Sequence, residues 1–200
     1  MSDIIAKSHR LRLEDLLPAY RHGIFPMGYA GTHWVTWHQP PLRGILPLDT
    51  AHFSKSLTRT LKQHRYRVSF NEAFDEVMRA CARSPDECWI TDAFRAAYGA
   101  LQQQGHAHSL EIWVDNALAG GLYGVHIGGA FFAESKFHHV RDMSKVALAE
   151  LVQHLRARDF RLLDVQYETG HLSQFGVISL PLPAYSQKLN EATSLDRKFL

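Results

Sequence analysis

Apolar residues recur every three or four positions in several segments of the chain, which is the spacing of helices with one buried face. This pattern predicts helices over 12–22, 53–64, 73–81, 91–105 and 143–158, with a short one near 169–175. Asn71 is expected to cap the helix that follows it, because an Asn side chain accepts hydrogen bonds from the first free N–H groups of a helix. Helices are therefore expected at intervals from the N-terminal region to about residue 175.

Short apolar or alternating runs between these helices predict strands. They lie at 66–70, 108–114, 118–126, 130–136, 161–166 and 177–180, with further short strands expected within 26–49. A three-stranded meander, a long helix and a strand in this order are typical of an α+β sheet of the acetyltransferase (GNAT) type, which a V-shaped opening splits. We therefore expect an acetyltransferase-like domain over 66–200 and a small N-terminal α/β lobe over 1–65.

Composition is that of an ordinary globular protein, since 46% of the residues are hydrophobic and 21% are charged. No apolar run is long enough to cross a bilayer, and the first residues do not form a signal peptide. Cys81 and Cys88 fit reduced thiols better than a disulfide framework. We therefore expect a cytoplasmic monomer that has no membrane partner and no metal.

Charge is unevenly distributed although the net charge is only +2. No acidic residue occurs from Thr50 to Asn71. A basic face of this kind is suited to phosphate, and a solvated helix face is an equal alternative. The candidates for tRNA contact in this stretch are Lys55, Arg59, Lys62, Arg65 and Arg67.

The stretch 120–137 is the most informative part of the chain, because two apolar runs flank a glycine pair and the second ends in the carboxylate of Glu134. A carboxylate there is costly if it is buried and useful if it meets a cationic ligand. The turn at 137–145 contains no glycine. Its backbone is therefore poorly suited to cradle the pyrophosphate of coenzyme A, which disfavours that donor.

Nine short motifs in order resemble one protein family. They are found at 20–26, 43–48, 89–91, 105–109, 120–124, 132–135, 144–148, 164–166 and 171–176. The chain resembles leucyl/phenylalanyl-tRNA–protein transferases over roughly residues 15 to 189. Because so many ordered motifs rarely coincide by chance, the resemblance is specific.

The resemblance implies transfer of Leu or Phe, and Met more weakly, from aminoacyl-tRNA to the N-terminal amine of proteins that begin with Arg or Lys. The product is marked for degradation by the N-end rule. The aminoacyl ester is already activated, so no cofactor is implied. Its partners are then Leu- and Phe-tRNA and protein N-termini.

The family pattern implies roles for individual residues. Asp164 and Gln166 belong at the reaction centre, where Asp164 either takes a proton or only positions groups, and Gln166 holds Asp164 or the developing oxyanion. Bare statistics would make Asp164 a capping residue instead. The implied substrate contacts are Leu122, Phe131 and Phe137 for the side chain of the amino acid, Glu134 for the cationic acceptor or the amine of the amino acid, Trp89 and Met27 for the terminal adenine, and Ser135 with no specified group.

Two departures from the family pattern concern the donor. Met27 stands where Trp is frequent, and Lys136 replaces Met beside the expected pocket. The alternatives are a coenzyme A-dependent N-acetyltransferase and a non-catalytic module that binds tRNA or N-terminal peptides. Fold alone does not separate these functions, because function resides in the site.

Overall fold

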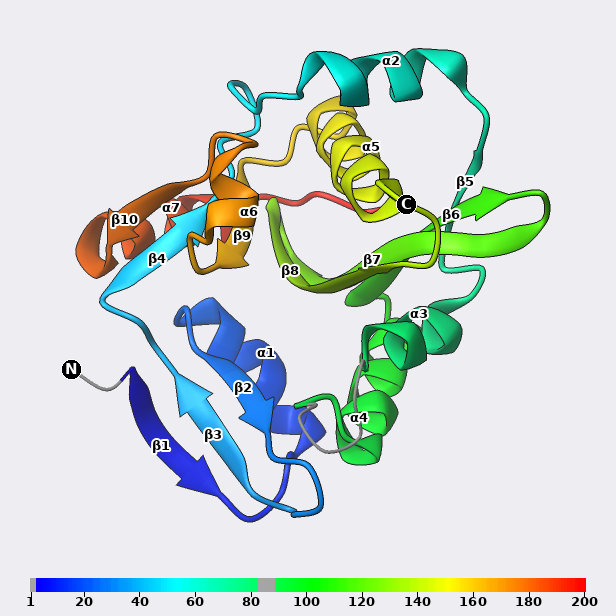
Figure 1. Ribbon diagram of the computed structural model, residues 1–200. Helices are drawn as coiled ribbons and strands as arrows, with labels where there is room; N and C mark the ends of the chain where they lie inside the picture. The colour runs from blue at the N-terminus through cyan, green and yellow to red at the C-terminus, as the bar shows by residue number, and fades with distance from the viewer. Residues whose placement is uncertain (1–2, 83–88) are drawn as a thin grey trace.

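The computed structural model describes residues 3–82 and 89–200. A small antiparallel sheet comes first, with the strands in the order β1-β3-β2 (Figure 1). Its strands are β1 (Ile4–Ser8), β2 (Phe25–Gly28) and β3 (Val35–His38), and helix α1 (Leu13–Arg21) lies between β1 and β2 in the chain. This part forms the N-terminal lobe.

The main sheet has seven strands in the order β10-β4-β9-β8-β7-β6-β5. Neighbouring strands are antiparallel except β8 and β9, which are parallel. The strands are β4 (Leu42–Ile45), β5 (Arg67–Phe70), β6 (Ala107–Val114), β7 (Ala117–Ile127), β8 (Ala130–His138), β9 (Leu162–Gln166) and β10 (Ile178–Pro181). The predicted meander is therefore β6, β7 and β8.

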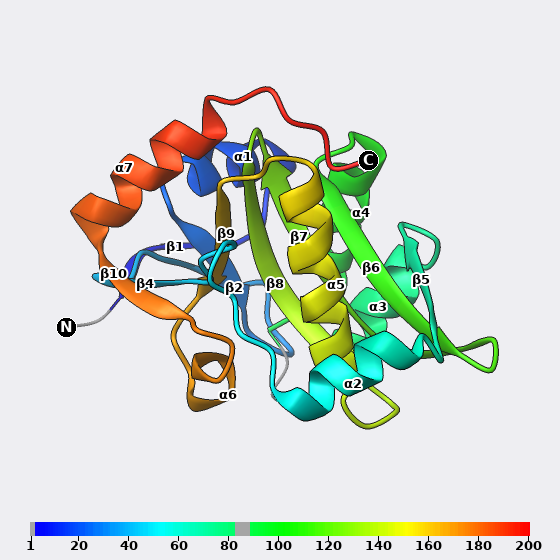
Figure 2. The ribbon, with the colours of Figure 1, turned by 90° about the horizontal axis from the view of Figure 1, so that it is seen from above.

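Helices cover both faces of the main sheet (Figures 1 and 2). One face carries α2 (Lys55–Gln63) and α5 (Met143–Ala157), whose apolar residues form one core with Phe131 and Phe199. The other core joins α1, α3 (Phe74–Cys81), α4 (Asp92–Gln103) and α7 (Leu182–Thr193) to Phe132 of the sheet. The short helix α6 (Gly170–Ser173) follows β9. The mixed α/β class and the acetyltransferase-type order of elements agree with the expectation.

One local prediction fails, and two elements were not predicted. Asn71 does not cap α3; it adopts a left-handed φ of 60°, and its side-chain oxygen accepts a hydrogen bond from the Ser109 amide of β6 at 3.0 Å. Helix α7 and strand β1 lie where no element was predicted. Tyr185, Leu189 and Ala192 of α7 are buried with helical spacing. The sequence therefore did carry the periodic pattern of a helix, immediately after Pro181 and Pro183. Of the two cysteines, Cys81 is a buried free thiol and Cys88 lies outside the described residues.

The chain passes from the small sheet to the main sheet before residue 65, where the sequence predicted the domain division. Strand β4 was assigned to the small lobe, yet it pairs with β9 and β10 inside the main sheet. Helix α2 likewise packs its Leu57 into the core beneath α5. The two-domain description stays a prediction, and the change of sheet falls between His38 and Leu42.

The parallel pair β8 and β9 separates partway along its length. The paired positions end with Phe132 opposite Asp164. Just beyond this point the register of β8 against β7 shifts, since Ser135 pairs with Tyr123 and Ala133 with Gly124. Glu134 is thus the extra residue of a β-bulge, a feature that bends a strand and re-aims its side chain. This is the V-shaped opening that the order of elements predicted.

Gly124 lies opposite this bulge and has no space for a side chain. A Cβ there would sit 2.2 Å from the Phe132 carbonyl oxygen and 2.5 Å from the Phe131 ring. We expect Gly124→Ala to lower the free energy of unfolding by about 1–3 kcal/mol or more, because close-packed cores tolerate overpacking poorly.

Gly99 on α4 is the control for this substitution, since nothing lies within 4 Å of a Cβ placed there. Gly99→Ala should raise the free energy of unfolding by about 0.5–1 kcal/mol, because Ala is the better helix former. Urea unfolding of both variants measures the two effects. Equal stabilities of the two variants would contradict the tight packing at the bulge.

Candidate active site

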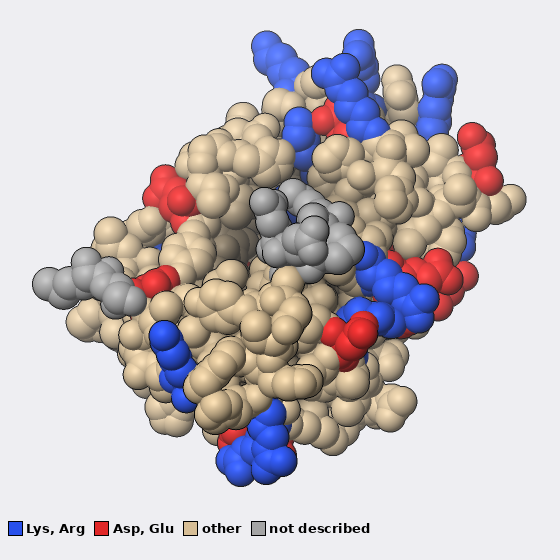
Figure 3. Space-filling view, turned by 60° about the horizontal axis from the view of Figure 1, so that its bottom comes forward, with Lys and Arg blue, Asp and Glu red and all other residues tan. Residues whose placement is uncertain are grey.

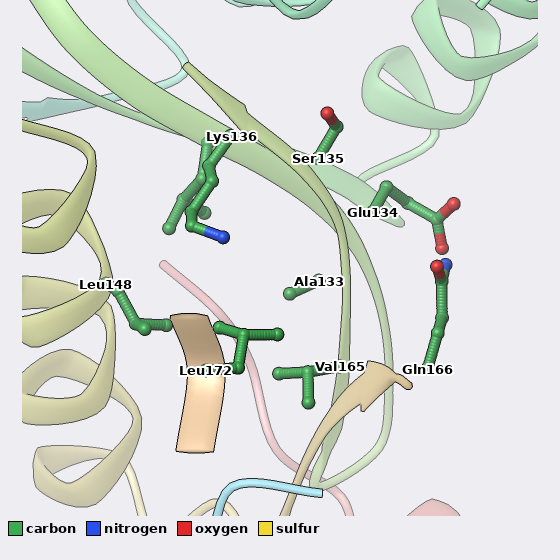
Figure 4. Close-up of a pocket in the computed structure, with 9 residues that line it drawn as sticks. Ala133, Glu134, Ser135, Lys136, Leu148, Val165, Gln166 and Leu172 are labelled. Carbon is green, nitrogen blue, oxygen red and sulfur yellow. The ribbon is translucent and has the colours of Figure 1, made fainter. Parts of the chain in front are cut away.

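A cavity of about 100 Å³ occupies the opening between β8 and β9 (Figure 4). Its walls come from β7, β8, β9, α5 and α6. The lining residues are Leu122, Ala133, Glu134, Ser135, Lys136, Leu148, Val165, Gln166 and Leu172. The cavity is therefore apolar along one wall and carries polar and charged groups from the bulged segment of β8 and the end of β9.

Glu134 is the buried carboxylate of this cavity, with 7% of its surface exposed. The Tyr98 hydroxyl donates to its Oε2 at 3.5 Å, and the hydroxyls of Tyr98 and Tyr20 lie 2.5 Å apart. The side-chain amide of Gln166 points toward the same carboxylate (Figure 4). Glu134 Oε1 nevertheless has no hydrogen bond within acceptable geometry among the described residues. One oxygen of this carboxylate is thus left for a ligand.

Burial raises the pKa of Glu134 from its usual 4.5 to about 7. Desolvation is the largest cause, because the charged form loses water that the protein does not replace. The Tyr20 hydroxyl, the Arg43 charge and the Gln166 amide act in the opposite direction, and the Asp164 charge adds to the rise. A carboxyl group with a pKa near neutrality is suited to exchange a proton with an amine.

Asp164 is completely buried and does not line the cavity. Arg43 Nε of β4 lies 3.0 Å from both of its carboxylate oxygens, and the Tyr185 hydroxyl of α7 also donates to it. The backbone N–H of Gln166 donates to Asp164 Oδ1 at 2.8 Å. Because its oxygens are engaged within the protein, Asp164 is placed to position groups rather than to touch an amine.

Gln166 ends β9 in a left-handed conformation with φ of 65°. Such a conformation is unusual for a residue other than Gly, and it clusters at functional sites. The hydrogen bond from its amide N–H to Asp164 holds it, and its side chain then faces Glu134 (Figure 4). Asp164 and Gln166 therefore act through different atoms, one inside the core and one at the cavity.

The predicted substrate contacts divide into two groups. Leu122, Glu134 and Ser135 line the cavity, as Gln166 does. Phe131 and Phe137 do not line it. Phe131 is fully buried and stacks on Phe199 at 5.1 Å between ring centroids, and Phe137 is 3% exposed and packs against the main sheet. The two rings lie in different cores, because the bulge at Glu134 between them shifts the alternation of β8.

Neither Trp89 nor Met27 lines the cavity. A Cβ on Gly28 of β2 would meet the Trp89 carbonyl oxygen at 2.6 Å, so the two segments are in close contact. Both side chains are partly buried against the same core. The structure thus places the Trp89 segment against β2, and the role of both residues toward the adenine stays a prediction.

The predicted tRNA-binding residues are only partly together. Lys55, Arg59 and Lys62 line one hollow on α2. Figure 3 shows Lys and Arg side chains projecting together from the upper edge of the molecule. Arg67 lies apart on β5, where its guanidinium contacts Glu72 at 2.5 Å and covers the Trp113 ring at 4.9 Å. Arg65 is exposed between α2 and β5.

The sequence interpretation missed the groups that hold the site together. Arg43, Tyr20 and Tyr98 were not named as site residues, although each polar group stands among apolar neighbours, which is a signal of a buried network. Of the apolar wall, Leu148 was read as core, and Val165 and Leu172 were noted only as parts of the family motifs. In the described ranges 3–82 and 89–200 no group of three His, Cys, Asp or Glu side chains is placed to hold a metal, and no helix there is long and apolar enough to span a membrane.

Comparison with known proteins places these features in one family. The leucyl/phenylalanyl-tRNA protein transferase family matches residues 45–190, and its N-terminal domain matches residues 9–41. The chain is 45% identical over 186 residues to a leucyl/phenylalanyl-tRNA–protein transferase of Gloeobacter violaceus, covering 93% of this chain and 96% of that protein. It is 48% identical over 177 residues to the Salinibacter ruber protein of the same name, covering 88% and 78%.

A solved structure is only distantly similar. The structure of L-PGS from Bacillus licheniformis is 12% identical with a TM-score of 0.46, and the match covers 84% of this chain and 57% of that one. A likeness at this level carries no inference about function.

Replacing Glu134 tests its buried, raised-pKa state. Since the pKa is higher in the folded protein than in the unfolded chain, the group's contribution to stability is complete below about pH 4.5 and is lost as pH rises through about 7. We therefore expect Glu134→Gln to be more stable than wild type at pH 8, by of the order of 2 kcal/mol, and to lose this advantage at pH 5. Urea unfolding at both pH values measures it.

Glu191→Gln on the exposed face of α7 is the control and should show the same small difference at both pH values. An advantage of Glu134→Gln that is equal at pH 5 and pH 8 would contradict the raised pKa.

Proposed function

The chain belongs to the leucyl/phenylalanyl-tRNA–protein transferase family, and we propose that it transfers Leu or Phe, and Met more weakly, from aminoacyl-tRNA to the N-terminal amine of proteins beginning with Arg or Lys. The cavity between β8 and β9 is the reaction site. The observation that carries this proposal is the buried Glu134 carboxylate beside an apolar wall, whose Oε1 accepts no hydrogen bond from the part of the chain that the structure describes. An α-amine next to an apolar side chain complements both features.

The reaction needs little chemistry from the protein. The amine nitrogen attacks the ester carbonyl carbon, the C–N amide bond forms, and the bond to the terminal ribose oxygen of the tRNA breaks. The proton lost by the amine passes to that ribose oxygen. Holding the two groups in line supplies about 7–11 kcal/mol of the barrier reduction available to such reactions. An α-amine has a pKa of about 8, so only modest help is needed to free its lone pair.

Glu134 and Gln166 supply that help. With a pKa of about 7, Glu134 is substantially ionised at neutral pH and accepts a hydrogen bond or a proton from an amine. The Gln166 amide beside it has donors for an oxygen that becomes negative during attack. Asp164 acts as a positioning residue, because it fixes the backbone of Gln166 from inside the core.

The apolar wall receives the side chain of the transferred amino acid. Leu122, Leu148 and Leu172 are aliphatic and suit Leu or Phe. An apolar wall separates related apolar side chains only weakly, by about 1–3 kcal/mol per methylene, which fits acceptance of more than one amino acid. Lys136 at the rim disfavours a cationic donor side chain.

The tRNA contacts proposed outside the cavity follow from the same placement. Met27 and Trp89 receive the terminal adenine, and the basic face of α2 meets backbone phosphates. We further propose that the protein acts in the cytoplasm as a monomer and marks its acceptors for degradation by the N-end rule.

Transfer of radiolabelled Leu from Leu-tRNA to a peptide beginning with Arg tests the proposal. Wild type is expected to transfer Leu. Gln166→Asn is expected to lower kcat about a hundredfold, because Asn tolerates the left-handed backbone but its shorter side chain moves the side-chain amide away from Glu134. Gln104→Asn, at the exposed end of α4, is the control and should retain full activity. No transfer by wild type from Leu-, Phe- or Met-tRNA would overturn the proposed function.

A separate prediction concerns the basic face of α2. Arg59 lines the hollow of α2, whereas the charge of Arg67 is matched by Glu72. We expect Arg59→Ala to weaken tRNA binding and to flatten its dependence on log salt concentration by about 0.7–0.9, the value for one phosphate that is no longer neutralised. Arg67→Ala should have a smaller effect in the same filter-binding titrations. Equal losses of tRNA binding in the two variants would show that the ion pair with Glu72 does not keep Arg67 from contacting tRNA.

A further inference from the structure

A second hollow adjoins the candidate active site at the turn between β8 and α5. It has a volume of about 490 Å³ and is lined by Lys136, His138, Arg141, Asp142, Ser144, Lys145, Thr169 and His171. Lys136 also lines the reaction cavity, and α6 contributes Leu172 to that cavity and His171 to the hollow. The two spaces are therefore neighbours that share Lys136 and α6 as their common boundary.

The hollow gathers cations and hydrogen-bond donors. Asp142 lies 2.8 Å from Lys145 Nζ and 3.7 Å from Arg141 Nε, and Lys136 lines the same hollow. Two histidine rings and the hydroxyls of Ser144 and Thr169 complete the lining. Arg141 is 95% exposed and contributes nothing to a core. An excess of flexible cations with hydroxyl donors is the chemistry that recognises phosphate.

The position of the hollow indicates which phosphate. Seen from above, the turn between β8 and α5 lies at the same edge of the molecule as the basic helix α2 (Figure 2), and α2 packs against α5. Basic side chains thus occur beside the cavity and again on α2, as a polyanionic strand leaving the cavity would require. A small nucleotide would need only the first set.

The chemistry of the turn also favours a strand over a compact pyrophosphate. Residues 137–145 contain no glycine, and Asp142 adopts φ of 68° with its side chain committed to Lys145. Long side chains rather than backbone N–H groups therefore make the contacts. Such contacts follow a phosphodiester backbone without reading its sequence.

We propose that this hollow binds a backbone phosphodiester of the 3′ strand of the donor tRNA, next to the aminoacylated end. This inference rests on the proposed function and adds a binding site to it. Lys145 exchanges Asp142 for the phosphate when the tRNA binds, and Arg141 supplies a second contact.

The test compares Arg141→Ala/Lys145→Ala with wild type on two donors. With Leu-tRNA, KM should rise about tenfold and the dependence on log salt should flatten by about 0.7 for each cation removed from the phosphate, with kcat little changed. With 3′-leucyl-adenosine, which has no phosphate, the two proteins should be equal. Arg158→Ala/Lys188→Ala removes two exposed cations elsewhere and is the matched control, with no expected effect on either donor.

Asp142→Asn gives an effect of opposite sign that loss of folding cannot imitate. Asn keeps the left-handed backbone, and its neutral side chain releases Lys145, so KM for Leu-tRNA should fall. An unchanged KM for Leu-tRNA in the double variant, an equal loss with leucyl-adenosine, or micromolar binding of inorganic pyrophosphate that leaves tRNA binding intact would each overturn the inference. Failure of wild type with both donors would instead overturn the proposed function.

Discussion

The buried ion pair between Arg43 and Asp164 is the interaction on which the rest of the site depends. Both side chains are almost completely inaccessible, so each charge requires the other. The pair joins β4 to β9, takes in Tyr185 of α7, and reaches the N-terminal lobe through the hydrogen bond from Arg43 Nη1 to the Gly23 carbonyl at 3.2 Å. Loss of one partner would leave an isolated buried charge and loosen all four elements together.

The same pair determines how the reaction cavity is built. Asp164 is the last residue of β9 that pairs with β8. Its Oδ1 accepts a hydrogen bond from the backbone N–H of Gln166, two residues further along the strand. On the facing strand, the bulge at Glu134 turns a carboxylate toward Gln166. One side of the opening is therefore formed by the bulge of β8 and the other by the hydrogen-bonded end of β9. Its desolvated carboxyl group reduces stability at neutral pH, which is the usual cost of preparing a group for chemistry.

Much of the architecture followed from local patterns, and the exceptions have physical causes. The helices of the main domain and the meander carry strong periodicity, so their positions were predictable. Asn71 was misread because its amide serves a neighbouring strand, a long-range contact that no local rule contains. Phe131 and Phe137 flank the bulge, and the family pattern could not tell which rings face the cores. The pairing of strand β4 with β9 could not be read from local patterns, because the two strands are distant in sequence.

The sequence by itself determined the fold class, the family and several of the residues that line the cavity, because periodicity and ordered motifs are properties of short segments. Tertiary structure alone decided that Asp164 is enclosed while Glu134 keeps an open oxygen, that Arg67 is neutralised, and that a basic hollow adjoins the cavity. Burial and charge pairing are set by residues far apart in the chain. The pKa of Glu134 is therefore a property of the assembled core rather than of its motif.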